Sequence, residues 1–331
     1  MSRFKGLPPA LQGAIRWGLA LLLLGLVGYQ LAMQWGKLGD QPITVSWPWV
    51  GASALGLALF LTLSAEGWRR LVCGLDERLS FKDAFRILFY SNLGEYLPGG
   101  VWNMVGRVAL AQRVGVPPLK TSATLLMEVA CQVTAAILVA LLTFPAFAGQ
   151  GMLANPLLLA GAAIAVIIGM HPRILNAVLA LGERLTKKTL PRFPFSYRFI
   201  LGMLAYYTLN WLILGASFAA LGQALLATPL TPGQLGLLVG SFAVAWNVGV
   251  FAFFFPAGLG VREVALITLL ASAFPPAWPA VLALVARVWI LAGEALAFGV
   301  AMLLKGPEAQ AAWTEQRVPE APSVAAGAPE A

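Results

Sequence analysis

The sequence predicts an all-α polytopic membrane protein, a helix bundle of about 6–8 spans with two Pro-Gly-broken, re-entrant helix pairs. Apolar residues make up 59% of the 331 residues and charged residues only 11%, roughly half of their share in soluble proteins. Several apolar runs reach the about 18–20 residues that a helix needs to cross a bilayer. The net charge of +8 comes from Lys and Arg gathered at helix ends, which is typical of membrane orientation signals and not of a nucleic-acid-binding face.

The chain divides into a short cytoplasmic N-terminus (1–12), a transmembrane domain (13–305) and a tail (306–331). The first apolar run, 17–36, is longer than the about 7–15 residues of a signal peptide's apolar region, and it lacks a small-residue cleavage site. We therefore interpret it as an uncleaved first span. The tail is rich in Ala, Pro and Glu, a composition that predicts disorder.

The second span, 47–68, is followed by the first broken helix pair. An amphipathic stretch, 81–93, and a second stretch, 101–114, flank the sequence Pro98-Gly99-Gly100. Each stretch is about 20 Å long at about 1.5 Å per residue, too short to cross a membrane alone. A re-entrant hairpin therefore fits this region better than two spans.

Further spans are predicted over 119–144, 156–170, 199–221, 234–255 and 277–304. The second break, Pro256 to Gly260, lies between the fourth of these and a short apolar piece, 261–274. This piece is either a short return span or one arm of a hairpin that enters from the opposite side of the membrane. Both interpretations leave the orientation of the other spans unchanged.

Lys and Arg fall almost entirely in the loops of one side. The opposite loops, near 147–155, 223–233 and 274–279, contain neither residue, and only Lys37 departs from the pattern. By the positive-inside rule both termini are cytoplasmic, and we expect a multi-pass protein of the cell's inner (plasma) membrane.

The two breaks predict a substrate-binding site. A helix broken at membrane depth points free N–H groups and the positive end of its dipole into a cavity, and arginine adds a bidentate partner for phosphate or carboxylate. Ionisable residues inside a membrane are usually functional, although pairing that merely holds the fold is the alternative. The predicted site residues are Glu95, Pro98, Gly99, Gly100, Arg107, Glu128, Gly258, Gly260, Arg262 and Glu263.

Other polar residues within spans have simpler expected roles. Glu128 shares a helical face with Thr124 and Gln132, and this face either lines the substrate path or bonds a neighbouring helix. Arg287 and Glu294, on one face of the last span, are expected to form salt bridges within the bundle. Helix packing is the expected role of Tyr207, Asn210, Ser217, Ser241 and Asn247.

Residues for catalysis or metal binding are scarce. The chain has one histidine, His171, and two scattered cysteines, Cys73 and Cys131. This set does not provide a Ser-His-Asp triad, a zinc cluster or haem ligands, and no nucleotide-binding fingerprint occurs. We therefore expect no cofactor, no metal, no nucleic-acid partner and no enzyme activity.

The motifs resemble those of the lysylphosphatidylglycerol synthase transmembrane (flippase-like) domain family. Pro256-Ala-Gly-Leu-Gly-Val-Arg262-Glu263 is similar to the family's Pro-Gly-Gly-Leu-Gly-x-Arg-Glu, and Asn92-Leu-Gly-Glu-Tyr-Leu-Pro98-Gly99-Gly100 with Arg107 is similar to its first motif. The chain departs at Glu128-Val-Ala-Cys-Gln132, where the family tends to have Glu-Arg-x-x-Asp. It departs again at Trp102-Asn103-Met104, where the family is more charged.

The resemblance covers most of residues 10–304 and implies a bundle that moves lipids between leaflets, here as a stand-alone member without the synthase domain. It implies a lipid flippase or transporter for an anionic or glyco-lipid. The alternative is a non-catalytic accessory subunit of an envelope glycolipid or isoprenoid-lipid biosynthesis pathway, with a glycosyltransferase or lipid synthase as partner. A lipid-modifying transferase is a third possibility, but the sequence offers it no evident nucleophile.

Overall fold

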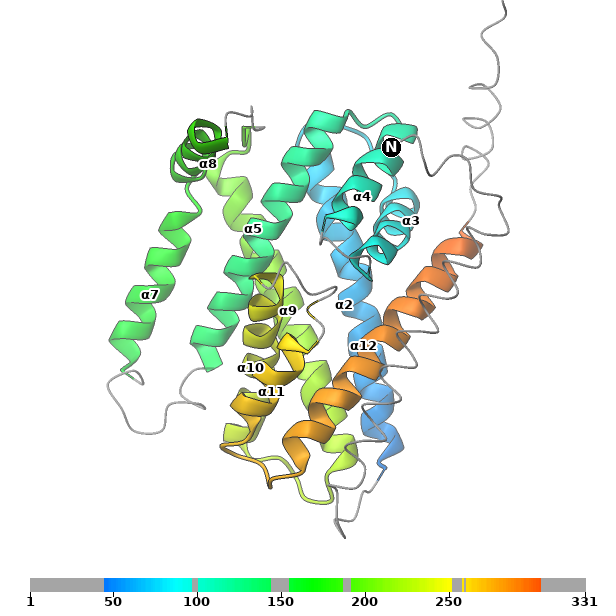
Figure 1. Cartoon of the computed structure of the whole chain (residues 1–331), viewed down its shortest axis with the longest axis vertical. Helices are drawn as coiled ribbons and strands as arrows, with labels where there is room; N and C mark the ends of the chain where they lie inside the picture. Colours follow the sequence, from blue (N-terminus) through cyan, green and yellow to red (C-terminus); the bar gives the residue numbers. More distant parts are fainter. Residues whose placement is uncertain are drawn as a thin grey trace, which may run out of the picture.

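The computed structural model describes residues 45–96, 101–143, 155–186, 192–251, 258 and 260–304. Helices make up all of the regular secondary structure in these ranges (Figure 1). The predicted first span over 17–36 and the predicted tail lie outside the described residues, as do Pro98, Gly99 and Gly100.

Five of the described helices are long and apolar enough to cross a membrane. They contain 20 to 29 residues, so they are about 30–43 Å long at about 1.5 Å per residue, and the hydrocarbon core of a bilayer is about 30 Å thick. The predicted fold class is therefore confirmed. These helices are α2 (Trp47–Cys73), α5 (Pro118–Thr143), α9 (Tyr197–Leu225), α10 (Pro232–Phe251) and α12 (Trp278–Leu303).

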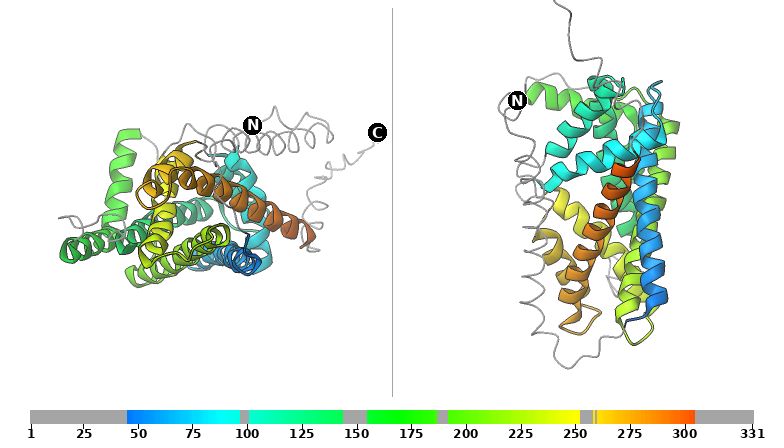
Figure 2. Two further views of the ribbon diagram at one scale, coloured as in Figure 1. Left: turned by 90° about the horizontal axis from the view of Figure 1, so that it is seen from below. Right: turned by 90° about the vertical axis from the view of Figure 1, so that its right-hand side faces the viewer.

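The span predicted over 156–170 is one arm of a bent pair. Helix α7 (Pro156–Gly169) has 14 residues, or about 21 Å, and is too short to cross alone. The chain then bends by 69° into α8 (Pro172–Thr186), so that α8 turns away from the bundle axis (Figure 2). Counted together, the two helices form a sixth candidate span.

The first Pro-Gly break is flanked by a helical hairpin, as predicted. Its arms are α3 (Phe81–Asn92) and α4 (Trp102–Arg113), and the 3₁₀ turn η2 (Leu93–Tyr96) extends the first arm. A Cβ atom on Gly94 would lie 2.6 Å from the backbone of Trp102, so only glycine lets the arms approach this closely. We call this unit the first hairpin; it enters the bundle from the end where α2 finishes and α5 begins (Figure 1).

The second break is also flanked by a hairpin. Helix α11 (Val261–Leu270) has 10 residues, or about 15 Å, which is too short for the return span considered above. It packs against α10 and enters from the end opposite to the first hairpin (Figure 1). Gly258 and Gly260 turn the chain into α11 with φ angles of 65° and 82°, a left-handed conformation that favours glycine. We call α10 and α11 the second hairpin.

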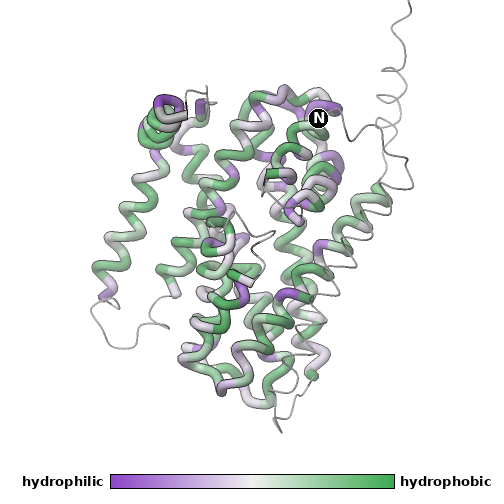
Figure 3. The backbone as a smooth tube through the Cα atoms, in the orientation of Figure 1, coloured by the Kyte–Doolittle hydropathy of each residue, from purple (hydrophilic) through white to green (hydrophobic). Residues whose placement is uncertain are grey.

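Polar contacts between spans hold α2 against α9. The Asn210 side-chain amide donates to Ser64 Oγ at 3.0 Å, and Ser217 Oγ donates to the Ser53 carbonyl at 2.5 Å. The expected packing role of these two residues of α9 is confirmed. Figure 3 shows hydrophilic segments at the ends of the bundle and also in its middle, between the two hairpins.

Candidate functional site

The tips of the two hairpins meet at one cavity of about 210 Å³. Its walls come from both hairpins and from the long helices α2, α5, α9 and α12. A cavity of this size has room for several water molecules. The charged residues that line it are Glu95, Arg107, Glu128, Arg262, Glu263, Arg287 and Glu294.

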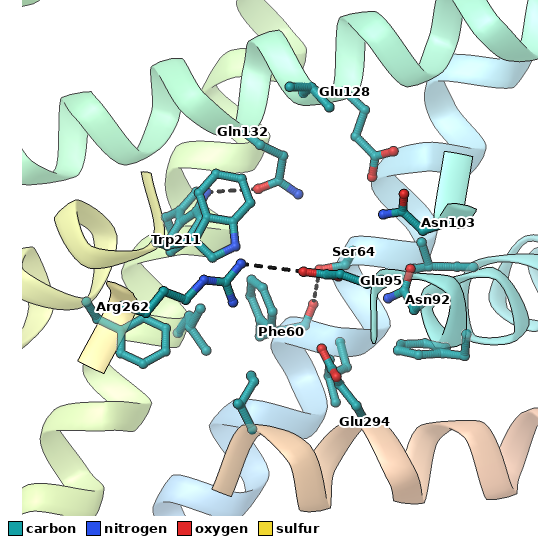
Figure 4. A pocket seen from close by; sticks show the side chains of 18 of the residues that line it. Phe60, Ser64, Asn92, Glu95, Asn103, Glu128, Gln132, Trp211, Arg262 and Glu294 are labelled. Carbon is teal, nitrogen blue, oxygen red and sulfur yellow. Dashed lines mark hydrogen bonds and ion pairs between the residues drawn. The ribbon is translucent and has the colours of Figure 1, made fainter. Parts of the chain in front are cut away.

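One ion pair joins the tips of the two hairpins. The side chains of Arg262 in α11 and Glu95 in η2 point toward each other across the cavity, with Nη2 and Oε1 separated by 3.5 Å (Figure 4). The two side chains are 20% and 33% exposed, so solvent in the cavity reaches both groups. Because this pair is long and accessible, an incoming anion can replace the carboxylate on the guanidinium group.

Two glycines provide the space for the Arg262 side chain. A Cβ atom on Gly249 of α10 would lie 2.5 Å from Arg262 Nε, and one on Gly258 would lie 3.0 Å from the same atom. Arg262 Nε is buried and has no hydrogen-bond partner among the described residues. Gly249 was missed by sequence reasoning, because a glycine in an apolar helix carries no signal of the side chain that crosses it.

Arg107 and Glu128 form a second, enclosed pair. Arg107 Nη1 donates to Glu128 Oε2 at 2.5 Å, and the two side chains are only 8% and 10% exposed. The same guanidinium group also reaches Ser91 Oγ and Asn92 Oδ1, both at 3.3 Å, and lies over the ring of Trp68. This pair fastens the first hairpin to α5 while it lines one wall of the cavity.

Glu263 connects the start of α11 with α12. Its Oε2 accepts a hydrogen bond from the Gly260 backbone N–H at 2.7 Å, which caps the helix, and its Oε1 lies 3.7 Å from Arg287 Nε. The salt bridge expected for Arg287 is therefore confirmed. The salt bridge expected for Glu294 is wrong: among the described residues its carboxylate has no cation within 4.0 Å and instead accepts a hydrogen bond from the Tyr96 hydroxyl.

Aromatic and amide side chains complete the walls. Trp211 Nε1 donates to Gln132 Oε1 at 2.9 Å (Figure 4). Trp246 packs edge-on against Trp211. Sequence reasoning missed both tryptophans as lining residues, since apolar residues are expected on every face of a buried span. Gln132 was predicted to share the face of Glu128, and both residues line the cavity.

The structure thus brings together five charged residues that the sequence predicted as site residues: Glu95, Arg107, Glu128, Arg262 and Glu263. Gly258 and Gly260 shape the start of α11. Within the described part of the chain, no cluster of His, Cys, Asp and Glu side chains is arranged to hold a metal ion. The site can offer an anion one accessible guanidinium group, that of Arg262.

A comparison with curated proteins finds no match. A family model described as "Lysylphosphatidylglycerol synthase TM region" matches residues 14–297. The matched range covers most of the chain and includes both hairpins and every residue of the cavity. The chain therefore belongs to the lysylphosphatidylglycerol synthase transmembrane-region family.

Proposed function

We propose that this protein moves an anionic or glyco-lipid between the two leaflets of its membrane, and that the lipid head group passes through the cavity between the hairpin tips. A charged group costs several kcal/mol at the centre of a bilayer. The hairpins enter from opposite ends of the bundle (Figure 1), and the cavity between their tips has polar walls that lower that cost. This position is the observation that carries the proposal.

Arg262 is the proposed binding group for the head group. Its ion pair with Glu95 is long, and both side chains of this pair are accessible. The planar guanidinium group also suits phosphate. The head group would take the place of the Glu95 carboxylate. Arg107, Glu128 and Glu263 then keep the cavity in shape, because their charges are matched within the bundle.

We further propose that transport leaves the lipid chemically unchanged. Among the described residues that line the cavity there is no His, Cys or Lys, so this part of the lining offers no imidazole, thiol or amine for covalent or general-base chemistry. We propose that a gradient of lipid or of a coupled ion drives net movement.

The orientation in the membrane is part of the proposal. We propose that the end of the bundle that carries the basic loops faces the cytoplasmic side of the inner membrane, with both termini on that side. Single cysteines at Asp76 and Thr228, in loops at opposite ends, test this placement. We expect an impermeant thiol reagent on intact cells to label T228C and not D76C, in a cysteine-free background; the reverse pattern would invert the topology.

The decisive test is lipid exchange in vesicles. The full-length chain is reconstituted with fluorescent phosphatidylglycerol, phosphatidylcholine or a glycolipid, and an impermeant reductant reports which molecules reach the outer leaflet. We expect the wild type to exchange anionic or sugar-bearing probes faster than phosphatidylcholine. R262A should exchange them at least about tenfold more slowly, the factor that corresponds to a loss of about 1.4 kcal/mol of binding energy. E77Q should exchange them as the wild type does.

Abundance and thermal unfolding of R262A are measured in parallel to separate folding from function. Exchange that equals protein-free vesicles for every probe would overturn the transport proposal. Binding of a probe without exchange, together with capture of a glycosyltransferase or lipid synthase, would instead support the accessory role.

A further inference from the structure

Among the described residues, the lining of the cavity contains one more carboxyl group than guanidinium groups. Four glutamates and three arginines of this part of the chain line it, which leaves their formal charge at −1. Each arginine has a glutamate within 4.0 Å: Arg107 with Glu128, Arg262 with Glu95, and Arg287 with Glu263. Among the described residues Glu294 is the lining carboxylate that no cation approaches within this distance.

Glu294 is instead held by Tyr96. The tyrosine hydroxyl donates to Glu294 Oε2, and Tyr96 follows Glu95 directly in the turn η2. Glu294 is therefore hydrogen-bonded to the residue next to Glu95, and Glu95 forms the ion pair that joins the two hairpins. The ionisable groups that face it are Tyr96 and Glu95 from η2, Arg262 from α11 and Arg287 from its own helix. The described residues that α2 and α3 contribute to the cavity are all uncharged: Phe60, Leu61, Ser64, Leu88, Phe89 and Asn92.

A surplus carboxylate in a cavity inside the bundle is costly, because burial removes hydration that the single hydrogen bond from Tyr96 replaces only in part. A bound proton removes this charge and makes the cavity formally neutral. Binding an anionic head group then adds one negative charge to a neutral cavity, and not to one that already carries −1. Proton and anion therefore favour each other's binding.

We propose that Glu294 binds one proton together with each anionic head group, so that lipid and proton occupy the cavity as a pair. This inference rests on the proposed function for the identity of the anion. Water in the cavity delivers the proton to a Glu294 carboxylate oxygen, and the resulting carboxylic acid can donate its O–H to the Tyr96 oxygen. When the head group leaves, the proton returns to water, so lipid movement would be coupled to the proton gradient.

Calorimetry on the purified full-length protein tests the pairing. Short-chain phosphatidylglycerol is titrated in two buffers that differ in ionisation enthalpy, and the difference in binding heat counts the protons taken up. We expect about one proton per bound lipid, with affinity falling by up to about tenfold per pH unit on the alkaline side, the limit for one linked proton.

The variant E294Q should bind the same lipid without proton uptake and with affinity independent of pH. The control variant E77Q removes a carboxylate that pairs with Lys120 outside the cavity, and it should behave as wild type. Lipid binding without proton uptake in the wild type, or undiminished uptake in E294Q, would overturn the proposal while leaving the transport function in place.

If no lipid binds, the proposed function fails, and infrared spectroscopy still tests the proton site. The carboxylic acid C=O band of the wild type is compared with that of E294Q and of Y96F across about pH 5 to 9. A band that is absent from E294Q and shifted in Y96F would establish Glu294 as a proton-binding group that is hydrogen-bonded to Tyr96. Identical titrations of wild type and E294Q would overturn the site.

Discussion

The two hairpins carry similar motifs, but they hold their arginines in opposite ways. Arg107 of the first hairpin is 8% exposed, donates to three side chains, and meets Glu128 at 2.5 Å. Arg262 of the second hairpin is 20% exposed, has one carboxylate at 3.5 Å, and keeps a buried Nε without a partner among the described residues. An arginine whose donors are already occupied stabilises the fold, whereas an arginine with free donors at a cavity can bind a ligand.

The largest loss of stability is expected for R107A. Removing this arginine leaves Glu128 as an uncompensated charge inside the bundle, which typically costs about 3–5 kcal/mol. Thermal unfolding in detergent and the yield of folded protein measure the loss. The double variant R107M/E128L should recover most of the stability, because apolar residues can replace a buried ion pair. If R107A remained stable but lost lipid exchange, Arg107 would be a head-group-binding residue like Arg262 and not a residue that stabilises the fold.

A smaller effect on stability and a larger one on function are expected for G249A. The new Cβ would lie 2.5 Å from Arg262 Nε and 2.6 Å from its Cγ, so the arginine must move away from Glu95. We expect a cost of about 1–3 kcal/mol from overpacking. Lipid exchange should fall toward that of R262A.

The matched control for G249A is G202A, in α9, where a Cβ atom would meet nothing within 4 Å. Because alanine favours helices over glycine by about 1 kcal/mol, this variant should be slightly stabilised and exchange lipid normally. Equal behaviour of the two variants would show that Gly249 does not position Arg262.

E95Q is expected to have the smallest effect on stability and to increase lipid binding. The pair with Arg262 is long and partly exposed, and such pairs contribute about 0–1 kcal/mol. Removing the competing carboxylate should leave stability nearly unchanged and bind anionic lipid up to about fivefold more tightly. The corresponding variant of the enclosed pair, E128Q in α5, removes the charged partner of Arg107 and should lose stability. Weaker lipid binding by E95Q would mean that Glu95 contacts the head group itself.

Much of the architecture follows from local sequence. Hydropathy over about 18 residues locates the long helices, and the short pieces beside each Pro-Gly break are too short to cross, which predicts hairpins. The cost of placing charge in a membrane also predicts that the charged residues near both breaks share one polar cavity. The structure confirms that expectation for five of them. The bend between α7 and α8 was not predicted, because the span was predicted to end at residue 170 and the basic stretch after it was assigned to a loop.

The sequence by itself determined which residues are too polar to face lipid, but only the tertiary structure decided how they pair. Arg262 and Glu95 lie 167 positions apart, and Tyr96 and Glu294 lie 198 apart, so no periodicity or spacing relates them. Their pairing depends on how α11 and α12 are placed relative to the first hairpin. The same arrangement makes Gly249 a requirement for Arg262 and, among the described residues, leaves Glu294 with no cation within 4.0 Å, because those properties arise between helices and not along the chain.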